Sequence, residues 1–118
     1  MTKTFPGMLL IGLPICLLAC AGTKPVEKEA DTKAAVRAAE EVGASQGPQS
    51  ALYLDLAKQQ IASAEKLMKD GEQDQAARML ERAKADAELA IALAKADDER
   101  ETANETAKRV QQLRDGRL

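Results

Sequence analysis

The stretch of sequence that decides the fold is AARMLERAKADAELAIALA, residues 76–94. Six of its residues follow one another at steps of four, three, four, three and four, which places them along one side of an α-helix. These six residues form what we call the alanine seam: Ala76, Leu80, Ala83, Ala87, Ala90 and Ala94. The alanines at five of these six positions allow a neighbouring helix to approach closely. The stretch therefore predicts a helix that packs against another helix along this seam.

The helix built around the alanine seam is predicted to be long. No glycine or proline occurs between Gln73 and Asp115, so one helix could continue to about Leu113 and measure ~60 Å. After residue 96 the apolar pattern thins, leaving a weak stripe at Ala103, Ala107, Val110 and Leu113. This distal part is either a solvated helix that frays or a surface that awaits a partner. The sequence slightly favours the solvated helix.

The preceding segment, residues 49–69, supplies a second helix for the seam to pack against. Its predicted core-facing stripe consists of Tyr53, Ala57, Ile61, Ala64 and Met68. Gly71 offers the left-handed conformation that a helix end favours. At about twenty residues, or ~30 Å, this helix can cover only half of the long one. The two segments together predict an antiparallel helical hairpin.

A shorter helix is predicted before the hairpin, over residues 27–42. Its expected buried face is a ladder of small side chains at Ala30, Ala34, Ala38 and Val42. Residues 43–48 end it, with Gly43 placed as a C-terminal cap and Pro48 suited to the first turn of the next helix. The predicted fold class is therefore all-α: an antiparallel helical hairpin with a preceding short helix and a long C-terminal helix, after a cleaved signal peptide.

The N-terminus carries an apolar run from Phe5 to Leu18, interrupted by prolines and glycines. A membrane-spanning helix needs roughly 20 apolar residues. The run is too short and too broken for that, and is typical of a signal peptide.

The end of this run, Leu17-Leu18-Ala19-Cys20, resembles the lipobox of bacterial lipoproteins. The resemblance implies cleavage before Cys20, lipid on its thiol and stable attachment to a membrane by acyl chains such as palmitate. Ala21 replaces the Asp that favours inner-membrane retention, which implies the outer membrane, facing the periplasm. The alternative is an ordinary secretory signal in which Cys20 and Cys16 play no part. The expected divisions are a signal peptide (1–19), a lipidated tether (20–26), an alanine-rich hairpin domain (27–96) and a polar extension (97–118).

Composition argues against most kinds of chemistry. Histidine and tryptophan are absent, and both cysteines, Cys16 and Cys20, lie in the signal and lipobox. The usual acid–base residue, the thiol nucleophile and the main soft metal ligands are therefore missing. Removal of residues 1–19 leaves 16 basic against 19 acidic side chains, a balance that implies no nucleic-acid partner. We predict no enzyme activity, no cofactor and no catalytic, metal or small-molecule site.

Two groups of polar residues have the chemistry of possible sites but not the required arrangement. The acidic run Asp97-Asp98-Glu99 lacks the glycine-containing loop spacing of a calcium site. Ser45, Ser50 and Ser63 have no histidine that could act as a base, because the sequence contains none.

The helical part of the chain resembles a family of bacterial lipoproteins named for the domain of unknown function 4398. The resemblance covers roughly residues 27–96 and rests on Gly43-Ala44, Pro48, Ala57, Gly71, Ala76-Ala77, Leu80 and the segment AKADAELA, residues 83–90. It implies a helical hairpin that turns at a glycine before an alanine-rich segment. The Tyr-Ala-Pro common before the hairpin is replaced by Gln46-Gly47-Pro48. Some relatives carry a peptidoglycan-binding domain after the hairpin; the sequence stops at Leu118, so wall binding by that route is not expected.

Two functions follow as hypotheses. The first is a lipid-anchored, non-catalytic interaction module that docks on an envelope protein. The second is a structural spacer, an oligomeric alanine-rich coiled coil like the small murein lipoproteins. Because 22 of residues 20–118 are alanine, a monomer would bury little area and be marginally stable. We therefore expect self-association through the alanine seam or a partner protein. The module is preferred because residues 43–48 and 70–71 interrupt a continuous rod, and because no terminal lysine offers the murein linkage.

Overall fold

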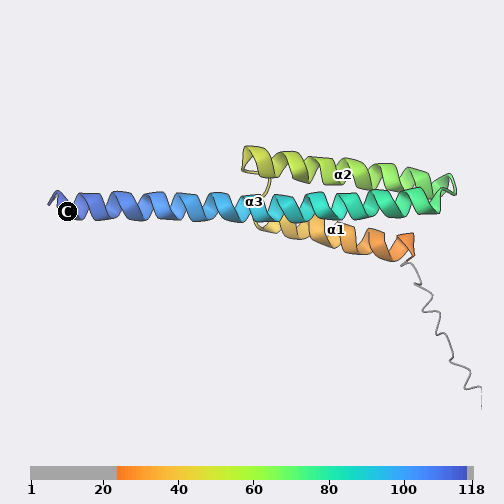
Figure 1. The fold of residues 1–118 in the computed structure, drawn as a ribbon, viewed down its shortest axis with the longest axis horizontal. Helices are drawn as coiled ribbons and strands as arrows, with labels where there is room; N and C mark the ends of the chain where they lie inside the picture. Colours follow the sequence, from red (N-terminus) through yellow and green to blue (C-terminus); the bar gives the residue numbers. More distant parts are fainter. Residues whose placement is uncertain (1–23, 117–118) are drawn as a thin grey trace, which may run out of the picture.

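The computed structural model describes residues 24–116, which form three helices joined by short turns (Figure 1). These are α1 (Pro25–Glu41), α2 (Pro48–Lys69) and α3 (Gln73–Arg114). No strand occurs within this part of the chain. The all-α fold class is confirmed, and so is the continuous long helix, which reaches Arg114.

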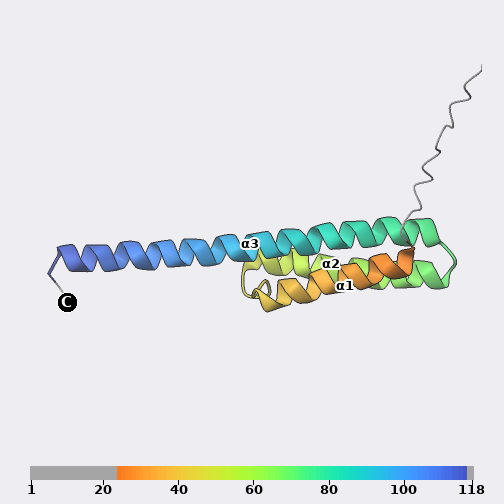
Figure 2. The ribbon, with the colours of Figure 1, turned by 90° about the horizontal axis from the view of Figure 1, so that it is seen from below.

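The three helices alternate in direction. α2 and α3 form the predicted antiparallel hairpin, and α1 runs parallel to the first half of α3 (Figure 1). In the perpendicular view, α1 and α2 both lie on one side of α3 (Figure 2). α3 contacts α2 most extensively and α1 next, whereas α1 and α2 contact each other least. α3 is therefore the central element on which the other two pack.

Glycines end the first two helices as predicted. Gly43 and Gly71 adopt φ angles of +77° and +84°, in the left-handed region that glycine enters without a steric penalty. After α1, the backbone N–H of Ala44 donates to the carbonyl of Ala39 (3.0 Å). After α2, the backbone N–H of Glu72 donates to the carbonyl of Leu67 (2.9 Å). These bonds satisfy carbonyls at the helix ends that have no partner within the helix. Each turn is thus fixed by local hydrogen bonds.

The core follows the alanine seam. All six of its residues are buried, five of them completely. On α2, the predicted Ala57, Ile61 and Ala64 are buried as well. Tyr53 and Met68 are only half-buried, and Leu54, which the predicted stripe omitted, is 3% exposed. The buried face of α2 is therefore turned slightly from the predicted one.

The predicted face of α1 is wrong. Ala30, Ala34 and Val42 are exposed, and the residues that α1 buries are Thr32, Val36 and Ala39. Alanines occur on several sides of this helix, so their spacing does not identify the side that faces the core.

Thr32 shows how closely α1 approaches α3. Its hydroxyl Oγ1 donates within α1 to the carbonyl of Lys28 at 2.7 Å and lies 3.2 Å from the carbonyl of Leu80 in α3. A side-chain hydroxyl reaches the backbone of a neighbouring helix only when the side chains between them are small. Ala76 and Ala83, one turn to either side of Leu80, meet this condition. The buried hydroxyl is thereby satisfied, which burial of a polar group requires.

Ion pairs join the outer edges of the helices. Lys28 of α1 pairs with Glu81 of α3, and Lys33 of α1 pairs with Glu65 of α2 at 2.7 Å. The hydrogen bond from Lys28 lowers the pKa of Glu81, and that from Lys33 lowers the pKa of Glu65. The bonds that Lys33 makes with Glu29 and Glu65 raise its own pKa. All these pairs are open to solvent, which weakens them.

Acid is expected to weaken the contacts of α1. Because the pKa values of Glu65 and Glu81 are lower in the folded chain, their contribution to stability is complete above the ordinary value of 4.5 and is lost as the pH falls through the folded values. The contribution of Lys33 is lost in the opposite range, as the pH rises through a folded pKa above 10.5. Thermal unfolding followed by circular dichroism should show a midpoint that falls as the pH drops below 4.5, by at most a few degrees from these two solvent-accessible glutamates.

The double variant Glu65→Gln with Glu81→Gln is the control, since neither replacement titrates. Its midpoint should fall less steeply with acid than that of the parent. Equal slopes for the two proteins would show that these ion pairs do not contribute.

Candidate functional site

The distal part of α3 extends beyond the other two helices. Every residue from Asp98 to Gly116 is exposed, whereas the alanine seam ends at Ala94, which is 8% exposed. The turn between α1 and α2 lies where α3 leaves the bundle (Figures 1 and 2). We call residues 98–114 the free half of α3.

The sequence explains why packing stops there. Continuing the spacing of the seam past Ala94 places only polar side chains on that side: Asp97, Glu101, Asn104, Lys108 and Gln111. These would gain nothing from burial against another helix. The bundle therefore ends where the seam becomes polar, and the helix continues alone.

The predicted stripe on the free half is present and exposed. Val110 is 51% exposed and Leu113 is 58% exposed, and Ala103 and Ala107 continue the stripe toward the bundle. Ala103 comes two residues after Glu101 and one before Asn104, so it is turned by about 160° and 100° from these two residues of the continued seam. The free half thus presents its apolar side chains in a direction that differs from the face covered by α1 and α2.

Charge changes sign along the free half and the residue before it. Residues 97–105 contain five acidic side chains and one basic one, Arg100. Residues 106–114 contain three basic side chains and no acidic one: Lys108, Arg109 and Arg114. We call these the acidic block and the basic block. The individual residues were visible in the sequence, but their separation into two blocks was not recognised there.

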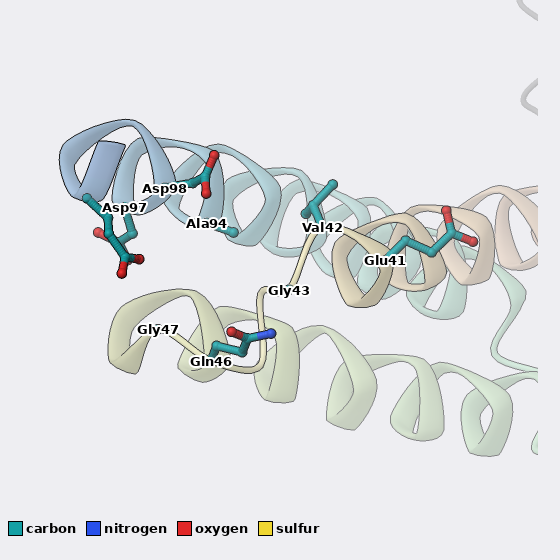
Figure 3. Close-up of a pocket in the computed structure, with 9 residues that line it drawn as sticks. Glu41, Val42, Gly43, Gln46, Gly47, Ala94, Asp97 and Asp98 are labelled. Carbon is teal, nitrogen blue, oxygen red and sulfur yellow. The ribbon is translucent and has the colours of Figure 1, made fainter. Parts of the chain in front are cut away.

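An open groove of about 490 Å³ lies beside the acidic block, where the bundle ends (Figure 3). We call it the acidic groove; it is lined by Glu41, Val42, Gly43, Gln46, Gly47, Ala94, Asp97, Asp98 and Glu101. Its residues come from the turn after α1 and from α3, segments about 50 residues apart in the sequence, so sequence patterns could not bring them together.

Asp97 contacts the start of α2. A Cβ atom at Gly47 would lie 2.7 Å from Oδ2 of Asp97 and 2.6 Å from Oγ of Ser50, closer than such contacts occur. Gly47 therefore allows the carboxylate to lie against the N-terminus of α2 (Figure 3), where the helix dipole favours negative charge. A second contact is with Nη1 of Arg100 at 3.5 Å. Asp97 therefore connects the N-terminal end of the free half to the bundle through a contact with the start of α2.

The carboxylates of the acidic groove do not converge. Asp97 extends toward α2, while Asp98 and Glu41 extend elsewhere (Figure 3). Within residues 24–116, no three acidic or cysteine side chains are grouped so that they could hold a metal ion. The acidic run Asp97-Asp98-Glu99 is among these residues.

Two of the serines noted in the sequence use their hydroxyls in hydrogen bonds to the backbone. Ser50 is buried, and its hydroxyl donates to the carbonyl of Gly47 at 3.1 Å. Ser63 donates to the carbonyl of Gln59 one turn earlier at 3.0 Å. Cys20, the predicted lipidation site, and the segment before it lie outside the described residues. Within residues 24–116, each helix is too short or too polar to cross a membrane.

The chain was compared with family models, curated proteins and solved structures, and only a family model matches. A family model described as "Domain of unknown function (DUF4398)" matches residues 27–111. No match was found among curated proteins or among solved structures. The matched range includes nearly all of α1, all of α2 and α3 as far as Gln111, and so extends beyond residue 96 into the free half. The chain therefore belongs to the family of the domain of unknown function DUF4398.

Proposed function

We propose that this protein is a lipid-anchored cell-envelope protein that acts as a non-catalytic helical interaction module. The observation that carries the proposal is the free half of α3, a helix with both Val110 and Leu113 more than half exposed. A single helix in water is marginal without tertiary packing. A partner that covers the apolar stripe would stabilise the free half and give it a function.

The lipobox supports the proposed anchor. With lipid on Cys20, four residues separate the anchor from Pro25, the first residue of α1, and the five steps from Cys20 to Pro25 could span at most ~17 Å. The start of α1 lies at the end of the bundle opposite to the free half (Figure 1). The bundle would then be held close to the bilayer, and the free half could extend away from it. Ala21 after the cysteine supports the outer membrane, facing the periplasm.

A spacer built on the alanine seam has less support. All six seam residues are already buried against α1 and α2 of the same chain. Oligomerisation through that seam would require the bundle to open. An enzyme has still less support, because the sequence lacks histidine and has no cysteine after Cys20.

Site-specific photo-cross-linking in cells tests the proposed module. A photoreactive amino acid is placed at Val110 or Leu113 of the full chain, and in a separate variant at Leu52 of α2. Leu52 is a matched control because it is 55% exposed, close to the other two, but lies on the bundle. We expect protein adducts from positions 110 and 113 and none from position 52. If positions 110 and 113 give no more adduct than position 52, the free half is not an interaction surface.

A further inference from the structure

We infer that the side of α3 that points away from α1 and α2 binds the same side of a second copy of this chain, with the two α3 helices antiparallel. The inference goes beyond the proposed function, because its residues precede Val110 and Leu113, the side chains on which that function rests. We call these residues the outer face of α3: Arg82, Ala85, Leu89, Ala92, Ala96 and Glu99.

The outer face lies on the uncovered side of α3. At 100° per residue, its six residues point within ~50° of one direction, which is nearly opposite to the alanine seam. In the perpendicular view, α1 and α2 both lie on one side of α3 and leave the other side open (Figure 2). Ala85 and Ala92 are accordingly exposed, Ala96 is half-buried and Leu89 is 40% exposed. Small side chains along this open side allow another helix to approach closely.

Four charged side chains border the apolar centre of the outer face. Arg82 and Glu99 stand at its two ends, and Glu88 and Lys95 lie along one edge, about 70° and 90° from its centre. None of the four makes an ion pair within residues 24–116. Their charges are therefore available to a partner that packs on this side of the helix.

One antiparallel alignment pairs the apolar residues of the outer face with one another. When Leu89 lies level with Ala92 of the second copy, the large side chain of one helix faces a small side chain of the other. Ala85 then lies level with Ala96 of the second copy. A two-fold axis relates the two helices, so each of these contacts occurs twice.

The same alignment pairs the charges. Arg82 lies level with Glu99 of the second copy, at either end of the apolar contact. Glu88 and Lys95 of the second copy lie on the same edge and differ in level by only ~3 Å along the helix axis. The complement of each charge is thus present in this sequence at the position that the two-fold axis requires. This self-complementarity is the reason for assigning a second copy to the outer face.

Other alignments of two copies lose this agreement. A parallel pair in register places Arg82 against Arg82 and Glu99 against Glu99. An antiparallel pair shifted by seven residues places either Leu89 level with Glu99 or the two copies of Glu88 beside each other. Charges that flank a helix pair set its orientation and register in this way.

The inferred pair leaves the end of the free half uncovered. Residue 108 lies level with residue 73 of the second copy, the first residue of its α3, so the paired helices overlap over residues 73–108. Val110 and Leu113 extend past this overlap and stay available to another protein. With lipid on Cys20, the two anchors stand at opposite ends of the pair. Paired molecules would therefore lie along the bilayer, whereas a single copy could extend away from it.

Cysteine cross-linking of the full chain in cell membranes tests the alignment. Three positions on the outward side of α3 are used: Ala85→Cys, Ala96→Cys and Ala103→Cys. A disulfide needs Cα atoms within about 7 Å. Positions 85 and 96 of different copies lie level in the inferred pair, whereas two copies of either position lie ~16 Å apart along the axis. Membranes are oxidised with copper phenanthroline, and the covalent dimer is measured by gel electrophoresis.

We expect a covalent dimer when the Ala85→Cys and Ala96→Cys variants are produced in the same cell, and none when either is produced alone. Ala103→Cys is the matched control. Position 103 points in the same direction but lies ~10 Å farther along the helix, so it should give no dimer with the Ala85→Cys variant. The parent chain, which retains Cys16 and Cys20, should also give none. Dimers from each single variant would indicate a parallel pair, and no dimer from any combination would exclude the contact; either result overturns the inference.

Charge reversal provides a second measurement that does not depend on cysteine geometry. Glu88→Lys with Glu99→Lys makes all four charges basic, and Arg82→Glu with Lys95→Glu makes all four acidic. Analytical ultracentrifugation of the full chain in detergent micelles measures the apparent dissociation constant of the dimer. Each double variant alone should raise it at least tenfold, and an equal mixture of the two should restore association.

Lys108→Glu with Arg109→Glu is the matched control for charge. It makes the same change in net charge as Arg82→Glu with Lys95→Glu on the same helix, but at positions turned ~130° from the outer face. It should leave the dissociation constant unchanged. Unchanged association of both outer-face variants would contradict the inference.

Failure of this inference can be told apart from failure of the proposed function. Photo-adducts of positions 110 and 113 with a different protein, without a disulfide dimer, would overturn the pair alone. A disulfide dimer without such adducts would support the pair and overturn the proposed role of the free half.

Discussion

Replacing Cys20 with serine is expected to abolish attachment of lipid to the protein. A thiol ionises to a nucleophilic thiolate far more readily than a serine hydroxyl does, so the variant offers no equivalent acceptor. Incorporation of labelled palmitate, measured on the immunoprecipitated chain, should fall to background. Two or more acyl chains give stable attachment at ~0.8 kcal/mol per buried methylene, so their loss would remove the proposed anchor of the chain.

Cys16→Ser is the matched control. Cys16 lies in the same apolar run, four residues before Cys20. The proposed cleavage before Cys20 would remove it, so this variant should incorporate label as the parent does. Equal incorporation by the Cys20→Ser variant, or no incorporation by the parent, would contradict the proposed anchor.

Replacing Leu80 with alanine is expected to lower the free energy of unfolding by about 2–5 kcal/mol. Leu80 is the only large side chain of the alanine seam and is completely buried. Its neighbours on the seam, Ala76 and Ala83, are too small to fill the space that its removal leaves. For a domain of this size, the thermal midpoint should fall by ~10 °C or more. Circular dichroism during heating or urea unfolding measures the change.

Leu89→Ala makes the same chemical change on the same helix at a position that is 40% exposed. Its cost should be well below that of Leu80→Ala, because little packing is lost at an exposed position. Similar midpoints for the two variants would mean that α1 and α2 do not pack on the alanine seam in solution.

The parts of the fold that were predicted correctly depend on local signals. The alanine seam repeats apolar residues at steps of four and three from residue 76 to residue 94, which identifies one side of the helix, and all six residues are buried. Gly43 and Gly71 were recognised because few other residues adopt positive φ angles at a helix end. Pro48 stands in the first turn of α2 for a similar local reason.

The parts that were missed depend on contacts between distant segments. On α1, alanines occur on several sides, and only contact with α3 decides which of them is buried. Thr32 could not be recognised as a core residue, because its hydroxyl is satisfied in part by the carbonyl of Leu80, 48 residues later. Similarly, the acidic groove combines Glu41 with Asp98, which no spacing in the sequence connects.

The uninterrupted backbone of α3 has a mechanical consequence. Sharp kinks in helices occur mainly at proline, at glycine or at inserted residues, and α3 has neither glycine nor proline from Gln73 to Arg114. Once a partner stabilises the free half, we therefore expect it to be a stiff continuation of the bundle, with no glycine or proline hinge at Asp97. A protein that binds the C-terminal end of α3 would therefore also fix the orientation of the whole three-helix bundle. With lipid on Cys20, the inclination of the molecule to the bilayer would then be set from the far end of a helix ~60 Å long.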